Sequence, residues 1–306
     1  MISKRTKTRD PISRDGPVIQ IFANPTSGSF DRGTLDSFLT ELQSRGVRTI
    51  MSWSTPGQYL VIDDEATAAC AFGGDGTTRH VAEAVSACGR TVPLSVFPAG
   101  TVNLLAREMV GRTGRADTAN LPDAGLKSHY GAKINSALFM VCASVGPDSR
   151  AVAIVSSRLK RVIGRSAYAL SFLGQWRRWP RETMTLSWDG GEIVCEAFYV
   201  AKGRYYAGPW SFAPHARVTD PLLHVVALLR ADRRRYLKFM WAVMMNKVEE
   251  DANLIRFTCT ALDIKAENAA PVQADGDIIT YLPATINVCP QPMPFFDITA
   301  AHGRNI

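Results

Sequence analysis

Three turns rich in glycine and small polar residues each follow a short apolar segment of strand length. They are residues 24–28 (NPTSG), 73–77 (GGDGT) and 98–101 (PAGT). Open α/β sheets bind ligands at the carboxyl ends of their strands. Backbone N–H groups of a glycine turn at the start of a helix bind anions, and glycine lets the backbone approach a phosphate closely. One such turn is also typical of a tight connection, but three on successive strands predict a phosphate site.

A carboxylate within the second turn indicates the kind of chemistry. Asp75 would repel phosphates unless a cation such as Mg²⁺ lies between them, or unless the carboxylate takes a proton. The common nucleotide motifs are absent, because the sequence has no GxxxxGK[ST] and no GxGxxG after the first strand. The pattern therefore predicts a nucleotide phosphate site of another type.

Strands and helices that could position these turns alternate in the first third of the chain. Apolar runs predict strands at residues 18–23, 47–53, 68–72 and 93–97, and helical spacing predicts helices at 35–44, 78–87 and 102–109. Strand, glycine turn and helix recur in this order. We therefore expect an open, mostly parallel α/β sheet.

The pattern changes after about residue 111. Strand-like runs then dominate, at residues 137–145, 183–188, 192–200, 222–229, 254–261 and 278–282. Residues 189–191 (DGG) are typical of a hairpin turn, and helical spacing is confined to 150–161, 167–177 and 234–245. We expect an antiparallel β domain with a few helices. The predicted division is a basic flexible tail at 1–16, an α/β domain at 17–125 and a β-rich domain at 126–306, whose final residues could return to the first domain.

The composition bounds the class of protein. The 306 residues include 35 Lys and Arg against 28 Asp and Glu, which gives a net charge of +7, and 46% are hydrophobic. This is globular rather than disordered composition. The sequence shows no run of about 20 apolar residues and no signal peptide, so we expect a soluble, cytoplasmic protein. The six cysteines form no metal-ligand spacing and are expected to be reduced core residues. The positive charge leaves nucleic acid, an anionic membrane or a phosphorylated substrate as partners.

The turns resemble the signatures of the diacylglycerol kinase catalytic domain family, which includes bacterial lipid kinases and sphingosine kinases. The blocks NPTSG, GGDGT and PAGTVNLLAR carry the resemblance in residues 18–110, and GGDGT is shared with NAD kinases and phosphofructokinases. Residues 145–148, 213–225 and 272–277 are similar to later family motifs, more loosely. The resemblance implies two domains, with ATP in the first and lipid in the cleft between them.

The resemblance also implies roles for individual residues. Asp75 would lie by the phosphates and the catalytic Mg²⁺, Asp275 would be the general base on the lipid hydroxyl, and Asp220 would belong to a structural metal site with backbone carbonyls. From the sequence alone, without the resemblance, Asp275-Gly276 is more typical of a plain turn. The implied nucleotide contacts are Asn24, Ser27, Gly28, Gly73, Gly74, Gly76, Thr77, Gly100, Thr101, Asn103 and Asp277.

Several positions depart from the family pattern. They bear on the substrate, the structural metal and the rate, and leave the phosphate turns intact. They are Ser29 and Phe30 after NPTSG, His80 after GGDGT, Leu104 after Asn103, Asp277 in place of Glu, and Pro221 after Asp220.

A long basic segment suggests a membrane surface. Residues 150–181 hold eight Arg and Lys and no Asp or Glu, interleaved with aromatic and aliphatic residues. This pattern suits an anionic bilayer, although a solvated helix face is an equal alternative. Residues 233–238 form a weaker basic cluster. The neighbouring Trp241, Met240, Met244 and Met245 are expected in the core.

Together these features predict an ATP- and Mg²⁺-dependent lipid kinase acting on a hydroxyl of a diacylglycerol-like or sphingoid lipid, with peripheral membrane association. The alternatives are an NAD kinase-like phosphotransferase and a regulator that binds nucleotide or lipid without catalysis. Nucleic acid is not expected as a partner, because no binding motif accompanies the charge. The choice of lipid and the oligomeric state, with a homodimer as one option, stay open.

Overall fold

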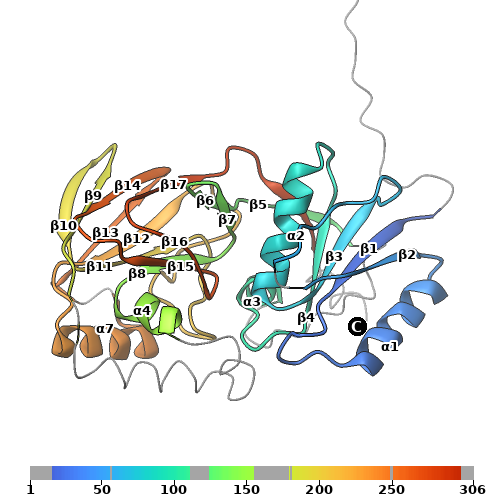
Figure 1. The fold of residues 1–306 in the computed structure, drawn as a ribbon, viewed down its shortest axis with the longest axis horizontal. Coiled ribbons are helices and arrows are strands. Elements are labelled where there is room, and N and C mark those ends of the chain that lie inside the picture. Colours follow the sequence, from blue (N-terminus) through green and yellow to red (C-terminus); the bar gives the residue numbers. More distant parts are fainter. Residues whose placement is uncertain are drawn as a thin grey trace, which may run out of the picture.

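The computed structural model describes residues 16–55, 57–110, 124–154, 179, 181–248 and 251–297. Two lobes lie side by side along the long axis of the molecule, with α2 and α3 near their boundary (Figure 1). Among the helices of these residues, none is long and apolar enough to cross a membrane. The combination of an α/β lobe and an antiparallel β lobe confirms the predicted fold class.

The first lobe is built on one six-stranded sheet in the order β2-β1-β3-β4-β18-β5, and all neighbours pair in parallel except β18 with β5. Every residue of β1 and β3 is buried, so these central strands read as continuous apolar runs. The strands are β1 (Val18–Ala23), β2 (Arg48–Trp53), β3 (Ala68–Gly73), β4 (Leu94–Pro98), β5 (Leu126–His129) and β18 (Met293–Phe296). The helices are α1 (Arg32–Ser44), α2 (Asp75–Ala87) and α3 (Leu104–Val110).

Two segments distant in sequence complete this sheet. β5 and β18 pair with each other, and Phe295 of β18 aligns with Leu94 of β4. The chain therefore returns to the first lobe near its end, which the sequence left open. The division at residue 125 stays a prediction.

The second lobe is a sandwich of two antiparallel six-stranded sheets, in the orders β10-β9-β14-β17-β6-β7 and β13-β12-β11-β8-β15-β16. A continuous set of buried apolar residues lies between them. Their strands are β6 (Ala132–Ile134), β7 (Ala137–Phe139), β8 (Cys142–Val145), β9 (Met184–Trp188), β10 (Gly191–Cys195), β11 (Ala197–Ala201), β12 (Leu223–Leu228), β13 (Leu254–Cys259), β14 (Ala261–Ala266), β15 (Pro271–Ala274), β16 (Asp277–Tyr281) and β17 (Ala284–Val288).

The predicted strands at 137–145 and 192–200 are each two strands in different sheets. β7 belongs to one sheet and β8 to the other, with a break at Met140 and Val141. β10 and β11 are divided in the same way around Glu196. Apolar residues flank each break, so the hydrophobic pattern alone predicts one continuous strand. The predicted hairpin at 189–191 is confirmed, since β9 and β10 pair antiparallel there.

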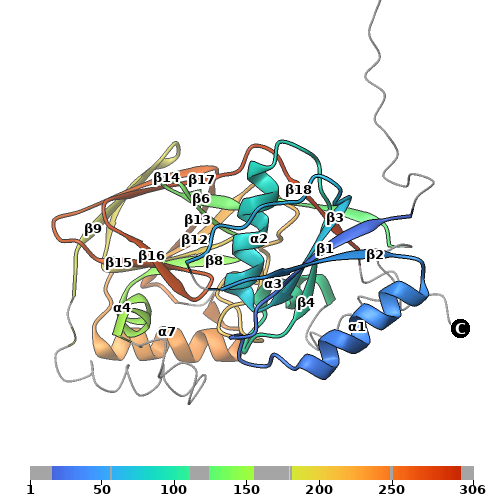
Figure 2. The ribbon, with the colours of Figure 1, turned by 45° about the vertical axis from the view of Figure 1, so that its right-hand side comes forward.

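Helices α4 (Pro147–Ile154) and α7 (Arg233–Met245) flank the second lobe at one side (Figure 2). The inner face of α7 buries Tyr236, Phe239 and Val243 against the outer face of β11 and β12. The expectation that its outer apolar residues lie in the core is wrong for three of them. Trp241 is 63% exposed, and Met244 and Met245 are exposed too, whereas Met240 packs against the core.

All six cysteines are free thiols, four of them buried, as the sequence predicts. Most of the basic segment 150–181 lies outside the described residues, as do residues 1–15 of the basic tail.

Candidate active site

The first two predicted turns are joined by a side-chain hydrogen bond. Nδ2 of Asn24 donates to Oγ1 of Thr77 at 3.0 Å. Oδ1 of Asn24 accepts from the backbone N–H of Thr26 at 2.9 Å, which orders the turn after β1. Ser27 closes that turn by donating its N–H to the carbonyl of Asn24. The side chain of Thr77 lies against Gly73, where a Cβ atom would approach within 2.4 Å.

The third turn lies against both of the others. A Cβ atom on Gly100 would lie 2.4 Å from Cα of Gly74, and one on Gly28 would lie 2.6 Å from Oγ1 of Thr101. These separations are far below van der Waals contact, so glycine is required for the turns to meet. The three turns form one surface at the carboxyl ends of β1, β3 and β4.

Asn103 fixes the shape of the third turn. Its backbone is left-handed, with φ of 55°, a conformation that Asn tolerates better than most residues. Oδ1 of Asn103 accepts from the N–H of Gly100 at 2.9 Å, and Nδ2 donates to the Gly100 carbonyl at 2.8 Å. Asn103 therefore shapes the turn from inside, and its amide is already engaged with the main chain.

Asp75 begins α2 and points toward the start of α3. Its Oδ1 accepts from the N–H of Leu105 at 3.2 Å. Burial, with a smaller contribution from the nearby carboxylate of Asp275, raises the pKa of Asp75 to about 6 against the lowering effect of backbone N–H groups. The two predicted catalytic carboxylates, one from each lobe, are thus close enough to affect each other.

Asp275 is held in a cradle of main-chain donors at the break between β7 and β8. Oδ2 accepts from the N–H of Met140 at 2.7 Å, and Oδ1 accepts from those of Val141 and Cys142 at 3.0 Å each. Asp275 is 6% exposed and has φ of 47°, followed by Gly276 at φ 90°. Two consecutive positive φ angles are typical of a hairpin turn, so residues 275 and 276 do form the plain turn that the Asp-Gly pair indicates. Burial raises the pKa of the carboxyl despite the three N–H donors.

Asp277 bridges the two lobes. Its Oδ2 would lie 3.1 Å from a Cβ atom on Gly76, so this carboxylate rests beside the second phosphate turn. The same oxygen is 3.7 Å from Nη2 of Arg79. Nη1 of Arg79 is 3.6 Å from Oε1 of Glu83. Glu83 accepts from the N–H of Leu138 in β7 at 3.3 Å. Helix α2 therefore carries contacts to the second lobe on consecutive turns.

A buried polar network that sequence reasoning missed supports the Asp275 turn. Gln273 accepts from the N–H of Gly276 through Oε1 and donates through Nε2 to Oγ of Ser144, each at 3.0 Å. Ser144 donates to Asp148, which also accepts from the hydroxyls of Tyr199 and Tyr206 at 3.0 and 2.9 Å. In the sequence, Asp148 stands out only through the family resemblance of residues 145–148. The separations along the chain, such as 129 residues between Gln273 and Ser144, leave no local signal.

Glu108 of α3 forms a second link between the lobes. Its Oε1 accepts from the N–H of Tyr205 at 2.7 Å and lies 2.6 Å from a Cβ atom that Gly203 would carry. Burial raises the pKa of Glu108 to about 7 against the lowering effect of the N–H groups of Tyr205 and Arg204. No motif or spacing in the sequence singles out Glu108.

Asp220 lies apart from the other predicted site residues. It follows a turn in which its N–H donates to the carbonyl of Arg217. Its own carbonyl and that of Leu222 accept from Nζ of Lys202, a side chain with no exposed surface. An ammonium therefore lies where the resemblance implies a metal with carbonyl ligands, and the residues present do not fit such a metal.

The carboxylates at the phosphate turns do fit a magnesium ion brought by a nucleotide. Asp75 and Asp277 supply the carboxylate oxygens that Mg²⁺ prefers, and Mg²⁺ commonly takes only one or two from protein and the rest from phosphates and water. The described residues contain no group of three or more His, Cys, Asp or Glu that could hold a metal ion.

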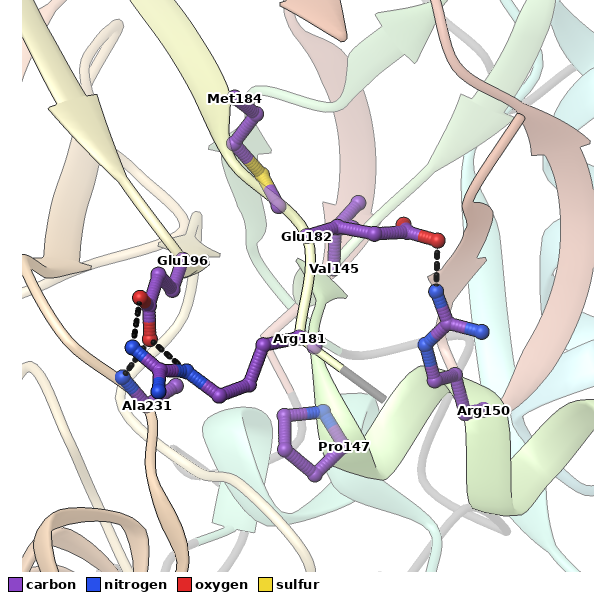
Figure 3. A pocket seen from close by; sticks show the side chains of 9 residues that line it. Val145, Pro147, Arg150, Arg181, Glu182, Met184, Glu196 and Ala231 are labelled. Carbon is purple, nitrogen blue, oxygen red and sulfur yellow. Dashed lines mark hydrogen bonds and ion pairs between the residues drawn. The ribbon is translucent and has the colours of Figure 1, made fainter. Parts of the chain in front are cut away.

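Two cavities lie away from the phosphate turns. The smaller, of about 10 Å³, has room for about one water. It is bordered by the pairs Arg150–Glu182 and Arg181–Glu196 (Figure 3). The described ends of the basic segment are therefore neutralised within the fold. The larger cavity, of about 580 Å³, lies between α3, β5, β18 and residues 204–219.

Comparisons with known proteins agree with this architecture. Residues 18–128 match the family model described as "Diacylglycerol kinase catalytic domain", and residues 141–296, about half of the chain, match "YegS C-terminal NAD kinase beta sandwich-like domain". A crystal structure titled as a diacylglycerol kinase from Bacillus anthracis superposes with a TM-score of 0.71 at 20% identity, covering 93% of this chain and 98% of that one. At this identity the likeness establishes the fold alone.

Curated relatives carry related names. A Pseudomonas aeruginosa protein named "Probable lipid kinase YegS-like" is 33% identical over 182 residues, which are 56% of this chain and 59% of that protein. The chain therefore matches about three fifths of the length of this relative. A "Diacylglycerol kinase" from Staphylococcus carnosus is 23% identical over 279 residues, 87% of this chain and 90% of that protein. By its two matched domains, the chain belongs to the diacylglycerol kinase catalytic domain family with a YegS-type C-terminal domain.

Proposed function

We propose that the protein is a lipid kinase that transfers the γ-phosphate of ATP to a hydroxyl of a membrane lipid, of the diacylglycerol-like or sphingoid class. The observation that supports this best is the position of Asp277, two residues after Asp275 in the second lobe, against Gly76 of the second glycine turn, next to Asp75. The names of the relatives support a lipid as the acceptor.

The nucleotide would be held mainly by main-chain groups of the three turns. Their N–H groups need no side-chain cation, which is consistent with Ser29 and Phe30 where the family often has a basic residue. Asp75 and Asp277 would orient a magnesium ion on the phosphates. Mg²⁺ neutralises the negative charge that the phosphates carry during transfer.

Asp275 has the acceptor capacity that a general base needs. A carboxylate offers about four lone-pair sites, and Met140, Val141 and Cys142 occupy three of them. One site on Oδ2 is left for the proton of a lipid hydroxyl. As the hydroxyl oxygen of the lipid bonds to the γ-phosphorus and ADP leaves, the hydroxyl proton passes to Oδ2 of Asp275.

The test is incubation of the purified protein with labelled ATP, Mg²⁺ and vesicles of a total lipid extract, followed by identification of the labelled product. Label in a lipid supports the proposal. Label on soluble NAD, with none in lipid, would favour the NAD kinase-like alternative. ATP binding without turnover on any lipid would favour the regulator, which the departures at His80 and Leu104 keep open.

We further propose that the outer face of α7 contacts an anionic bilayer. Its 13 residues include four cations and no acid, and three of the cations are arginines in the first turn. Cations there oppose the helix dipole, although Arg235 pairs with Asp232 at the N-cap and Lys238 with Asp251. Exposed Leu237, Trp241, Met244 and Met245 recur on the same face at three- and four-residue spacing. Basic residues beside exposed Trp, Leu and Met suit an interface with anionic lipid.

Sedimentation with vesicles tests this surface. We expect Trp241→Ser with Leu237→Ser to lose most binding to vesicles that contain phosphatidylglycerol, because each removes exposed apolar surface from the contact. Val61→Ser, which changes an exposed apolar residue of the first lobe, is the matched control. If the double variant sediments with vesicles as the parent does, α7 does not contact the bilayer. If the parent forms a dimer without lipid and the double variant does not, the exposed face of α7 contacts a second copy of the chain.

A further inference from the structure

A buried cation lies at the end of β11. Lys202 has no exposed surface, and its Nζ donates to the carbonyl oxygen of Leu222 at 3.0 Å and to that of Asp220. The ring centroid of Tyr130 lies 5.9 Å from the same nitrogen. An ammonium has three donors and no acceptor, so two carbonyls and an aromatic face make a suitable enclosure.

Burial of an ammonium is unfavourable unless hydrogen bonds or charges compensate it. The compensation here comes from the 217–222 loop, which also fixes itself through the N–H of Asp220 to the carbonyl of Arg217 and accepts the N–H of Tyr130 at Val218, at 2.7 Å. Lys202 thus holds together a loop whose carbonyls would otherwise converge on an empty space.

Convergent carbonyl oxygens beside a carboxylate are ligands that a hard metal ion takes. The family resemblance implies such a metal at Asp220, but the carbonyls of Asp220 and Leu222 are already occupied by a positive charge that belongs to the chain. We infer that the Lys202 ammonium replaces a structural metal ion in this protein, so that the 217–222 loop is ordered without any bound cation.

The main chain of Lys202 is connected to the proposed base, Asp275, by hydrogen bonds through Val141. The backbone N–H groups of Lys202 and Gly203 donate to the carbonyl of Val141, at 2.7 and 3.0 Å. The N–H of Val141 donates to Asp275. One residue therefore braces the peptide beneath Asp275 through its main chain and orders the 217–222 loop through its side chain.

The experiment is a thermal melt of the full chain in metal-free buffer, with and without chelator, and then with added Mg²⁺, Ca²⁺ or K⁺. It is done in a background with Asp75→Asn and Asp277→Asn, so that the two carboxylates at the phosphate turns do not report metal binding. We expect the melting temperature of this parent to be unaffected by chelator and cations. We expect Lys202→Ala to melt several degrees lower and to regain at least half of the loss with one of the cations.

Two further variants sharpen the comparison. Lys202→Met fills the space without a charge, so it should be destabilised but not restored by cations, whereas Lys133→Ala, at an exposed lysine, should match the parent throughout. A parent that loses stability with chelator and regains it with Mg²⁺ would overturn the inference. So would a Lys202→Ala variant that is fully stable, or one that no cation restores. If Lys202→Ala does not fold, the response of the parent to chelator decides.

Discussion

Replacement of Asp275 by Asn distinguishes a catalytic role of this carboxylate from a purely structural one. Asn keeps the size of the side chain and an oxygen that can accept from two of the three N–H groups in the cradle. It cannot take a proton at neutral pH. We expect the rate of lipid phosphorylation to fall roughly 10²- to 10⁴-fold, the usual contribution of a general base.

The expected cost in stability is small by comparison. The amide nitrogen replaces one carboxylate oxygen, so if the amide oxygen keeps Val141 and Cys142, the N–H of Met140 loses its acceptor. A buried unsatisfied donor costs about 1–3 kcal/mol. Burial already disfavours the charge on Asp275, as its raised pKa indicates, and the neutral amide relieves part of this cost. At about 2–4 °C per kcal/mol for chains of 150–250 residues, the melting temperature should fall by less than roughly 12 °C.

The assay measures labelled lipid, the melting temperature and the affinity for ATP on the same preparation. Asp189→Asn is the matched control, because Asp189 also begins an Asp-Gly hairpin turn but is exposed and far from the phosphate turns. If Asp275→Asn kept more than a tenth of the activity, the assignment as base would be wrong. If its activity fell only in proportion to the unfolded fraction, the role would be structural.

Three more outcomes follow from the geometry. Gly100→Ala should weaken ATP binding at least tenfold by calorimetry, because its Cβ would lie 2.4 Å from Gly74, whereas Gly125→Ala, with nothing within 4 Å, should bind normally. The acidic limb of kcat/KM should lie near pH 6, because Asp75 must be ionised and its pKa is about 6; a limb near pH 4 would contradict this. Glu108 has a folded pKa of about 7 against 4.5, so its contribution to stability is present below pH 4.5 and is lost as the pH rises toward 7. Glu108→Gln should therefore melt higher than the parent at pH 8 but not at pH 4.5, and equal differences at both pH values would refute the linkage.

The elements of the first lobe were predictable because each strand is a short buried run that ends at a glycine turn. The predicted bounds of β1 coincide with those observed, and α2 begins earlier than its apolar spacing suggests, since Gly74 and Asp75 start it. The second lobe was harder. The segment 137–145 is apolar throughout, and its break depends on N–H groups that bond to Asp275, about 135 residues away.

Some site residues carried a signal that could have been used. Lys202 directly follows the buried apolar run of β11, and a lysine next to such a run needs a partner for its charge. Gln273 and Glu108 carried none, because their partners lie in distant segments. The expectation that Trp241 lies in the core was wrong because apolar residues occupy both faces of α7, and periodicity does not tell which face is covered.

The break at Met140 and Val141 has an evolutionary consequence. The groups that hold Asp275 are peptide N–H groups, which every residue except proline provides. Side chains at 140–142 are therefore free to vary within the limits of core packing, while the acidic group keeps its setting. Among divergent relatives, this part of the site would persist as a shape of the main chain, so a search for invariant side chains would overlook it and a comparison of backbones would find it.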